Sequence, residues 1–237
     1  MARDKEKSIG ASFQAQTKFR RGKLPSKTGK VVATYKVYAD PLEVLALPAP
    51  KLRGGRGLWS ALATVRENIP EGGSLSQQHV SQILWATAGL TYGGQRTRAG
   101  ALSRPGVETY LMARQIDGIF PGVYHYNPRE HCLEYIGRDD SGKLLASALV
   151  NVEDVDACAA ILVYTGIPSR VEDGARSRAY RYLYLEAGSA AQCAVTSAVG
   201  LDLVASVRAE FYDDEVAQLL QVDGLIEFPL CCVTVGT

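Results

Sequence analysis

Apolar residues recur at helical spacing in several stretches of the chain. In residues 75–89 they lie between a serine cap and Gly89, at Val80, Ile83, Leu84 and Ala88, which predicts a helix. Residues 58–66 and 143–149 predict two shorter helices, and residues 213–220 predict a helix with acidic residues at its positive end. The longest helix is expected to begin near Arg176 or Arg178 and to end near Gly200.

Shorter runs, alternating or continuously apolar, predict strands. They cover residues 31–38, 108–114, 157–165, 201–211 and 227–236, and residues 121–137 read as an antiparallel hairpin with its turn near residues 127–129. Helices that alternate with a few strands around one long helix favour an α+β fold, with a central sheet flanked by helices.

The first part of the chain differs in composition from the rest. Residues 1–57 are rich in Lys, Arg, Pro and Gly, so we interpret them as an extended N-terminal segment that wraps a single domain at residues 58–237. Nine Lys and Arg lie in the first thirty residues, against Asp4 and Glu6. We interpret this stretch as a solvated N-terminus, and a nucleic-acid-binding arm is the alternative.

Overall composition excludes several classes of function. A net charge of +1 gives no general reason to expect nucleic acid or an acidic membrane as a partner. Five cysteines without C-x-x-C spacing indicate neither a disulfide framework nor a zinc site, and three scattered histidines indicate no metal site. No apolar run is long enough to span a bilayer, so we expect a protein that is soluble and cytoplasmic.

Two stretches carry candidate chemistry. The second half of the long helix is almost wholly Gly, Ala, Ser and other small residues, so another backbone, a ring cofactor or a second subunit can approach it closely. Gln192 on this helix could bind a cofactor or bond across a helix pair, whereas Cys193 reads as a packing residue. The loop at residues 89–107 is too long for a simple turn and is a candidate functional loop that contains Arg98.

Three stretches in this order resemble the nitroreductase superfamily, and within it the SagB-type dehydrogenase branch that includes azoline oxidases. They are FQAQTKFRRGKLP at residues 13–25, LSQQHVSQILWATAGLT with RTRAGAL and GVYHYNPREHCLEYI within residues 75–136, and RAYRYLYLEAGSAAQ at residues 178–192, followed by GLDLV and DDEVAQLL. The resemblance covers nearly the whole chain.

The resemblance implies an FMN-binding, nitroreductase-like α+β fold whose long central helix lies at a homodimer interface. It implies an FMN-dependent oxidoreductase that performs two-electron hydride transfer on a small or peptide-borne substrate, with NAD(P)H as a possible electron donor. Catalytic residues stay unassigned. The positions that match the flavin-contacting motifs of the family are Arg66, Arg98, Ala99, Gly100, Ala101, Leu102, Gln192 and Arg208.

One motif of the azoline oxidases is missing. Their Lys-Tyr pair would fall at about Gly174 and Ala175, so the base proposed for that reaction has no counterpart here and azoline oxidation is not expected. The alternative to an enzyme is a catalytically degenerate dimer, with or without flavin, that serves as a scaffold or partner subunit of a biosynthetic complex.

Overall fold

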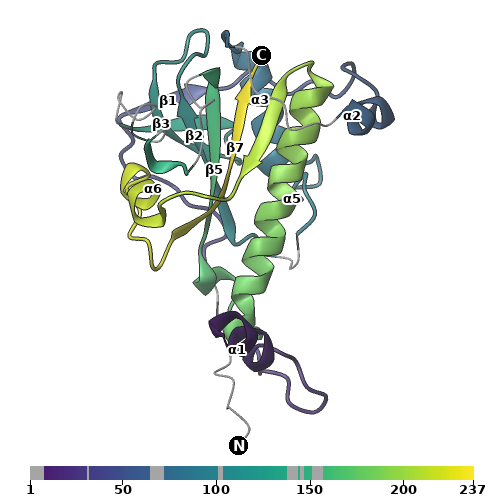
Figure 1. Ribbon diagram of the computed structural model, residues 1–237, viewed down its shortest axis with the longest axis vertical. Coiled ribbons are helices and arrows are strands. Elements are labelled where there is room, and N and C mark those ends of the chain that lie inside the picture. Colours follow the sequence, from purple (N-terminus) through teal and green to yellow (C-terminus); the bar gives the residue numbers. More distant parts are fainter. Residues whose placement is uncertain are drawn as a thin grey trace, which may run out of the picture.

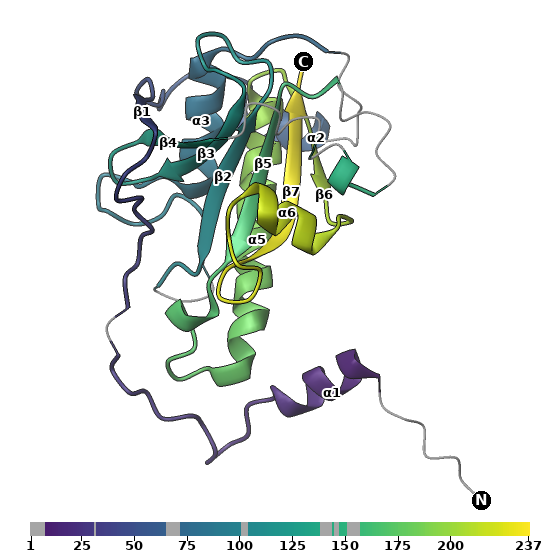
Figure 2. The same ribbon diagram turned by 90° about the vertical axis from the view of Figure 1, so that its left-hand side faces the viewer.

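Seven strands form one antiparallel sheet within the part of the chain that the computed structural model describes, residues 8–30, 32–64, 72–100, 104–137, 144, 147–150 and 157–237. The strand order is β1-β4-β3-β2-β5-β7-β6 (Figures 1 and 2). The strands are β1 (Glu43–Ala46), β2 (Val107–Ala113), β3 (Gly122–Asn127), β4 (Cys132–Gly137), β5 (Ala160–Gly166), β6 (Val204–Arg208) and β7 (Phe228–Gly236). The helices are α1 (Ile9–Gln16), α2 (Leu58–Thr64), α3 (Gln77–Ala88), α5 (Ala179–Gly200) and α6 (Asp213–Leu219), with short 3-10 turns η2 (Pro168–Arg170) and η3 (Arg176–Arg178).

The two faces of the sheet carry different layers. Helices α3 and α5 pack on one face and α6 packs on the other, as the two views in Figures 1 and 2 show. Alternation along β7 places the Cys231 side chain in the core under α3 and α5, and that of Cys232 in the core under α6. The predicted α+β fold with a helix-flanked central sheet is therefore confirmed, and all its strand pairs are antiparallel.

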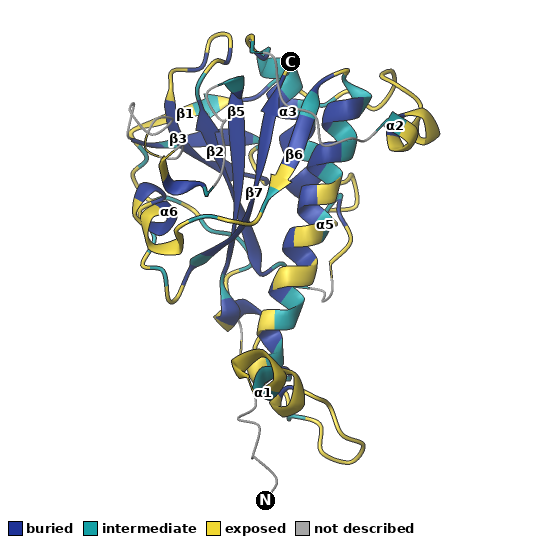
Figure 3. Ribbon diagram, viewed as in Figure 1, coloured by how far each residue is buried: buried dark blue, intermediate teal, exposed yellow. Residues whose placement is uncertain are grey.

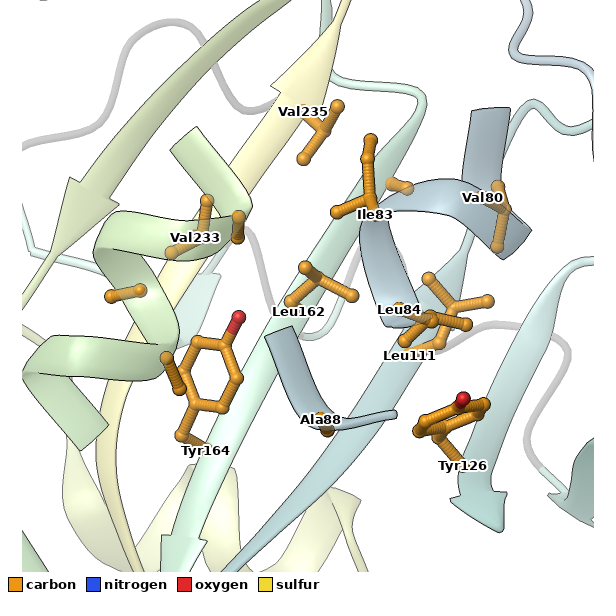
Figure 4. Close-up of a cluster of buried hydrophobic side chains, with 14 of the residues drawn as sticks. Val80, Ile83, Leu84, Ala88, Leu111, Tyr126, Leu162, Tyr164, Val233 and Val235 are labelled. Carbon is orange, nitrogen blue, oxygen red and sulfur yellow. The ribbon is translucent and has the colours of Figure 1, made fainter. Parts of the chain in front are cut away.

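Helix α3 agrees with its prediction at both ends. The Ser76 hydroxyl accepts a hydrogen bond from the His79 N–H at 3.2 Å, and the Gly89 N–H donates to the Trp85 carbonyl at 2.8 Å. Between these ends Ile83 and Leu84 are almost fully buried against the sheet, where each such side chain contributes roughly 1.5–3 kcal/mol. Figure 4 shows this cluster, with Ile83 and Leu84 of α3 beside Leu162 and Leu111 of the sheet.

Helix α5 uses its small residues to lie close to α3. The Thr87 hydroxyl donates to the Ala190 carbonyl at 2.6 Å and lies 2.8 Å from the Tyr164 hydroxyl. Five buried alanines form this face of α5: Ala187, Ala190, Ala191, Ala194 and Ala198. The opposite face, which includes Gly188 and Gln192, is exposed (Figure 3). One face of α5 thus packs closely against α3, while the opposite face is accessible.

The prediction of a strand at residues 31–38 is wrong for the described residues, 32–38, which form no strand. The edge strand of the sheet is instead β1, which pairs with β4. The backbone N–H of Lys36 donates to the buried Glu108 carboxylate at 2.9 Å, and the backbone of Tyr38 hydrogen-bonds Glu134. Side chains of the sheet therefore hold this stretch in place of a strand ladder.

The first helix, α1, lies at the far end of α5, beyond the sheet (Figure 2). No residue of α1 is buried, and two arginines of the central helix region attach its end. Arg178 donates to the Thr17 carbonyl at 2.9 Å, and Arg181 donates to the Gln14 carbonyl at 2.8 Å. Arg178 also lies 4.5 Å from the ring centroid of Phe19.

The other predicted elements agree with the structure within a few residues, except the helix expected at residues 143–149, which falls mostly outside the described residues. Over the described ranges, no helix combines the length and the apolar character needed to cross a membrane. The same ranges hold no group of three or more His, Cys, Asp or Glu side chains arranged to hold a metal ion.

Candidate functional site

A cleft of about 660 Å³ lies between α2, α3, α5 and the loop at residues 51–57. We call it the main cleft. Its wall on α5 lies on the partly exposed side of that helix, with Gln192, Cys193, Thr196, Ser197 and Gly200. Its wall on α3 carries Ser76, Gln78, His79, Gln82 and Ala86, and α2 contributes Leu58, Ala61 and Leu62. A cleft of this size with apolar walls and a few polar groups is typical of a small-molecule or cofactor site.

Three cations line the loop side of the main cleft. Arg56 forms an ion pair with Asp202 and donates to the Thr64 hydroxyl at 3.2 Å. The side chains of Lys51 and Arg53 have no hydrogen bond or ion pair with any described residue, so both charges are available to an anion.

Glutamines of α3 position this loop. The Gln82 side-chain oxygen accepts from the Lys51 N–H at 2.7 Å, and the Gln78 side chain donates to the Ala49 carbonyl at 3.2 Å. These residues are four apart on α3 and therefore lie on one face of the helix. The loop is thus attached through its backbone, which leaves its cationic side chains free to turn into the main cleft.

The loop also approaches the end of α5 closely. Gly55 has φ of +74°, and a Cβ atom there would lie 2.9 Å from the Gly200 carbonyl oxygen. The neighbouring Arg56 N–H donates to that same carbonyl at 2.9 Å. Glycine is therefore required at position 55 both by backbone conformation and by space.

We predict that Gly55→Ala shifts this loop and lowers stability by more than about 1–2 kcal/mol, because the added side chain meets the Gly200 carbonyl in addition to the cost of the left-handed region. Urea denaturation would measure the change. Gly54→Ala is the matched control, because its φ of +99° is also positive but no atom lies within 4 Å of its added Cβ. Equal losses in the two variants would show that contact with Gly200 contributes nothing.

The structure places the residues predicted from the family motif at different points. Gln192 lines the main cleft, and its side chain donates to the Thr196 hydroxyl at 2.9 Å. Arg98 does not line it: the guanidinium is buried, forms an ion pair with Glu186 of α5, and donates to the Thr87 carbonyl at 3.2 Å. Glu186 also accepts from the Gly106 N–H at 3.0 Å.

The remaining motif residues lie elsewhere. Ala99 and Gly100 are exposed on the loop after Arg98, and Arg208 lies at the end of β6, opposite Cys232 of β7. Arg66, Ala101 and Leu102 lie outside the described residues. The structure thus brings Gln192 to the main cleft and leaves Arg98 and Arg208 outside its lining.

Several cleft residues were not identified from the sequence. His79 and Gln82 lie on the face of α3 that meets the cleft, and the ring Nδ1 of His79 is buried without a hydrogen-bond partner among the described residues. The available signal was the i, i+4 pair of glutamines together with the arginines of the glycine-rich loop at residues 53–57. Burial raises the pKa of Cys193, which agrees with a packing role for this thiol.

Comparison with known proteins gives a consistent result. The model described as "Nitroreductase family" matches residues 73–237. A curated protein of Methanocaldococcus jannaschii whose name places it among the nitroreductases is 29% identical over 163 residues, which are 68% of this chain and 81% of that protein.

Two solved structures are similar in fold. A Ralstonia eutropha protein described as a nitroreductase superposes with a TM-score of 0.70 and 23% identity, covering 91% of this chain and 94% of that chain. A chain of the E. coli microcin synthetase McbBCD complex with truncated pro-MccB17 bound superposes with a TM-score of 0.63 and 25% identity, covering 85% of this chain and 84% of that chain. These likenesses confirm the expected nitroreductase-like architecture.

Proposed function

Because the chain belongs to the nitroreductase family, we propose that it is an FMN-dependent oxidoreductase that performs two-electron hydride transfer on a small or peptide-borne substrate. The observation that carries this proposal is the main cleft, which combines cations, amide side chains and apolar walls beside the small-residue face of α5. The likeness to a microcin synthetase chain, together with the motif at residues 13–25, supports placing the protein in the SagB-type branch.

The groups that line the main cleft fit the parts of FMN. Lys51 and Arg53 carry charges that no described residue neutralises, so they suit a phosphate. Gln82 and Gln192 present amide groups that suit hydroxyls or ring carbonyls. Leu58, Leu62 and Leu201 supply an apolar surface for a ring system.

When bound, FMN supplies the two-electron redox centre, while the protein binds and orients it and controls access of water. In this proposal Lys51 and Arg53 hold the phosphate, Gln192 orients the ring, and the open face of α5 lets a second copy of the chain cover the cleft. The family motif further assigns flavin contacts to Arg66, Arg208 and the loop at residues 98–102, and these contacts stay part of the proposal. The loop would act on the flavin across the dimer interface. NAD(P)H is the proposed donor for a reductase.

We predict that the double substitution Lys51→Gln with Arg53→Gln weakens FMN binding at least about tenfold, because hydrogen bonds to charged groups contribute about 1.5–3 kcal/mol each. Quenching of flavin fluorescence during titration of the purified protein would measure the affinity. Arg20→Gln is the control, since Arg20 is an exposed cation outside the main cleft. Unchanged affinity in the double variant, with wild-type protein that does bind FMN, would remove these cations from the site.

A further inference from the structure

We propose that the protein has a second binding site, for a planar apolar molecule that carries one anionic group. The site is a cleft of about 700 Å³ between residues 46–52, the C-terminal end of α3, the loop at residues 90–92 and the β3–β4 turn. We call it the second cleft. It shares no lining residue with the main cleft, so it is not part of the proposed FMN site.

The lining of the second cleft is mostly apolar. Residues 46–52 contribute Ala46, Leu47, Ala49, Pro50 and Leu52, and the facing side contributes Trp85, Leu90, Tyr92 and Pro128. The indole N–H of Trp85 donates to the Leu90 carbonyl at 3.1 Å, so the largest ring in the cleft is fixed in one orientation. A fixed aromatic surface between aliphatic side chains suits a planar apolar body.

One lining residue of the second cleft, the half-buried His131, is held by a polar network. Its Nε2 lies 2.9 Å from the Ser81 hydroxyl and 3.0 Å from the Pro48 carbonyl, and its Nδ1 lies 2.9 Å from the Tyr126 hydroxyl. Burial lowers the pKa of His131, although the Pro48 carbonyl opposes the shift, so the ring is neutral at pH 7. The site is therefore preformed, and His131 adds no charge to it.

The charges around the second cleft favour an anion. Two charged side chains line it, Arg129 and Glu130. Arg129 makes no ion pair with a described residue, and its guanidinium lies 5.5 Å from the centroid of the Tyr35 ring. A second guanidinium, that of Arg96, lies 5.1 Å from that centroid, and burial and the charge of Arg98 lower its pKa. Arg96 does not line the cleft, and Glu108 and Glu186 act on its charge, so Arg129 is the cation that a ligand would meet and the acid of a ligand would sit there.

Three probes with the same ring and different charge test the proposal: a naphthalene sulfonate, a naphthalene methanol and a naphthalene methylammonium ion. The chain has two tryptophans, Trp59 and Trp85, so in Trp59→Phe protein the emission reports Trp85 alone. Trp59 is 81% exposed, and its replacement leaves the core intact. We expect saturable quenching by the sulfonate, at least about tenfold weaker binding of the alcohol, and no saturation with the cation.

Two neighbouring substitutions then assign the anchor. Arg129→Gln should weaken sulfonate binding at least about tenfold, and Glu130→Gln should strengthen it. Arg53→Gln, in the main cleft, should change nothing, and saturating FMN should not displace the sulfonate. Preference for the cation, loss of binding in Glu130→Gln, or unchanged binding in Arg129→Gln would overturn the proposal. Failure of FMN to bind would leave the proposal of a second site unaffected, since ligand binding to the two clefts is measured separately.

Discussion

Replacing Arg98 with alanine should lower the free energy of unfolding by about 3–5 kcal/mol, the cost of removing one partner of a buried ion pair. The Arg98 side chain is 1% exposed and that of Glu186 is 5% exposed. Without the guanidinium, the Glu186 carboxylate stays buried, and the donor left to it among the described residues is the Gly106 N–H, at 3.0 Å. Urea denaturation of the purified protein, with and without added FMN, would measure the loss.

A double variant separates the ion pair from the loss of packing. Arg98→Met with Glu186→Gln removes both charges and keeps an acceptor for the Gly106 N–H, so it should be more stable than Arg98→Ala. Arg104→Ala is the control, because among the described residues its partly exposed guanidinium donates to the Lys30 carbonyl alone, at 2.9 Å, and its loss should cost less than about 1 kcal/mol. If Arg98→Ala keeps wild-type stability and loses only FMN binding, Arg98 acts on the flavin and not on the fold.

The fold could be predicted where local signals and packing agree. Helix α3 begins after Ser76 and ends at Gly89, as the capping pattern indicates, and β3 and β4 form the expected hairpin. Residues 32–38 show where a local pattern fails. Their alternation is typical of a strand, yet the backbone N–H of Lys36 bonds to a carboxylate 72 residues away. A partner so distant in the sequence leaves no trace in the local pattern.

The site could be predicted only in part for the same reason. Gln192 was identified because it lies on the small-residue helix, and the structure places it in the main cleft. The buried partner of Arg98 lies 88 residues further along the chain, so an arginine in a glycine-rich loop gave no sign of burial. Lys51 and Arg53 line the cleft because the glutamines of α3 hold this loop and Gly55 packs on the end of α5, and these contacts depend on the tertiary fold.

A second large effect is expected at His125, whose ring lies between two carboxylates on the α6 face of the sheet. Its Nδ1 is 2.7 Å from Glu134 and its Nε2 is 3.1 Å from Glu108. A neutral imidazole has one N–H, so this arrangement requires the doubly protonated, charged ring. Two other titratable rings lie near it: the ring centroids of Tyr110 and Tyr38 are 5.2 Å and 5.3 Å from that of His125. Arg170 also forms an ion pair with Glu108.

The pH dependence of stability follows from these contacts. Burial acts to lower the pKa of His125, but hydrogen bonds and attraction to Glu108 and Glu134 outweigh it, so the pKa is raised. The stabilisation is therefore complete below the unfolded-state pKa of about 6.5 and is lost as pH rises through the folded pKa. Glu108 behaves in the opposite way: its pKa of about 2 means that its contribution is lost as pH falls toward that value.

His125→Phe should lower the free energy of unfolding by about 3–5 kcal/mol at pH 6, because it leaves two buried carboxylates facing an apolar ring. It should also remove the decline in stability that we expect for the wild type as pH rises above the unfolded-state pKa of histidine. Urea denaturation across this pH range would measure both effects. His79→Phe is the control, because this half-buried ring has no carboxylate within bonding distance among the described residues and its loss should leave the alkaline decline unchanged. If stability still declines at alkaline pH in His125→Phe, another group titrates there. The charged ring would then not hold Glu108 and Glu134 in place, nor the backbone of Lys36 and Tyr38 that these carboxylates bind.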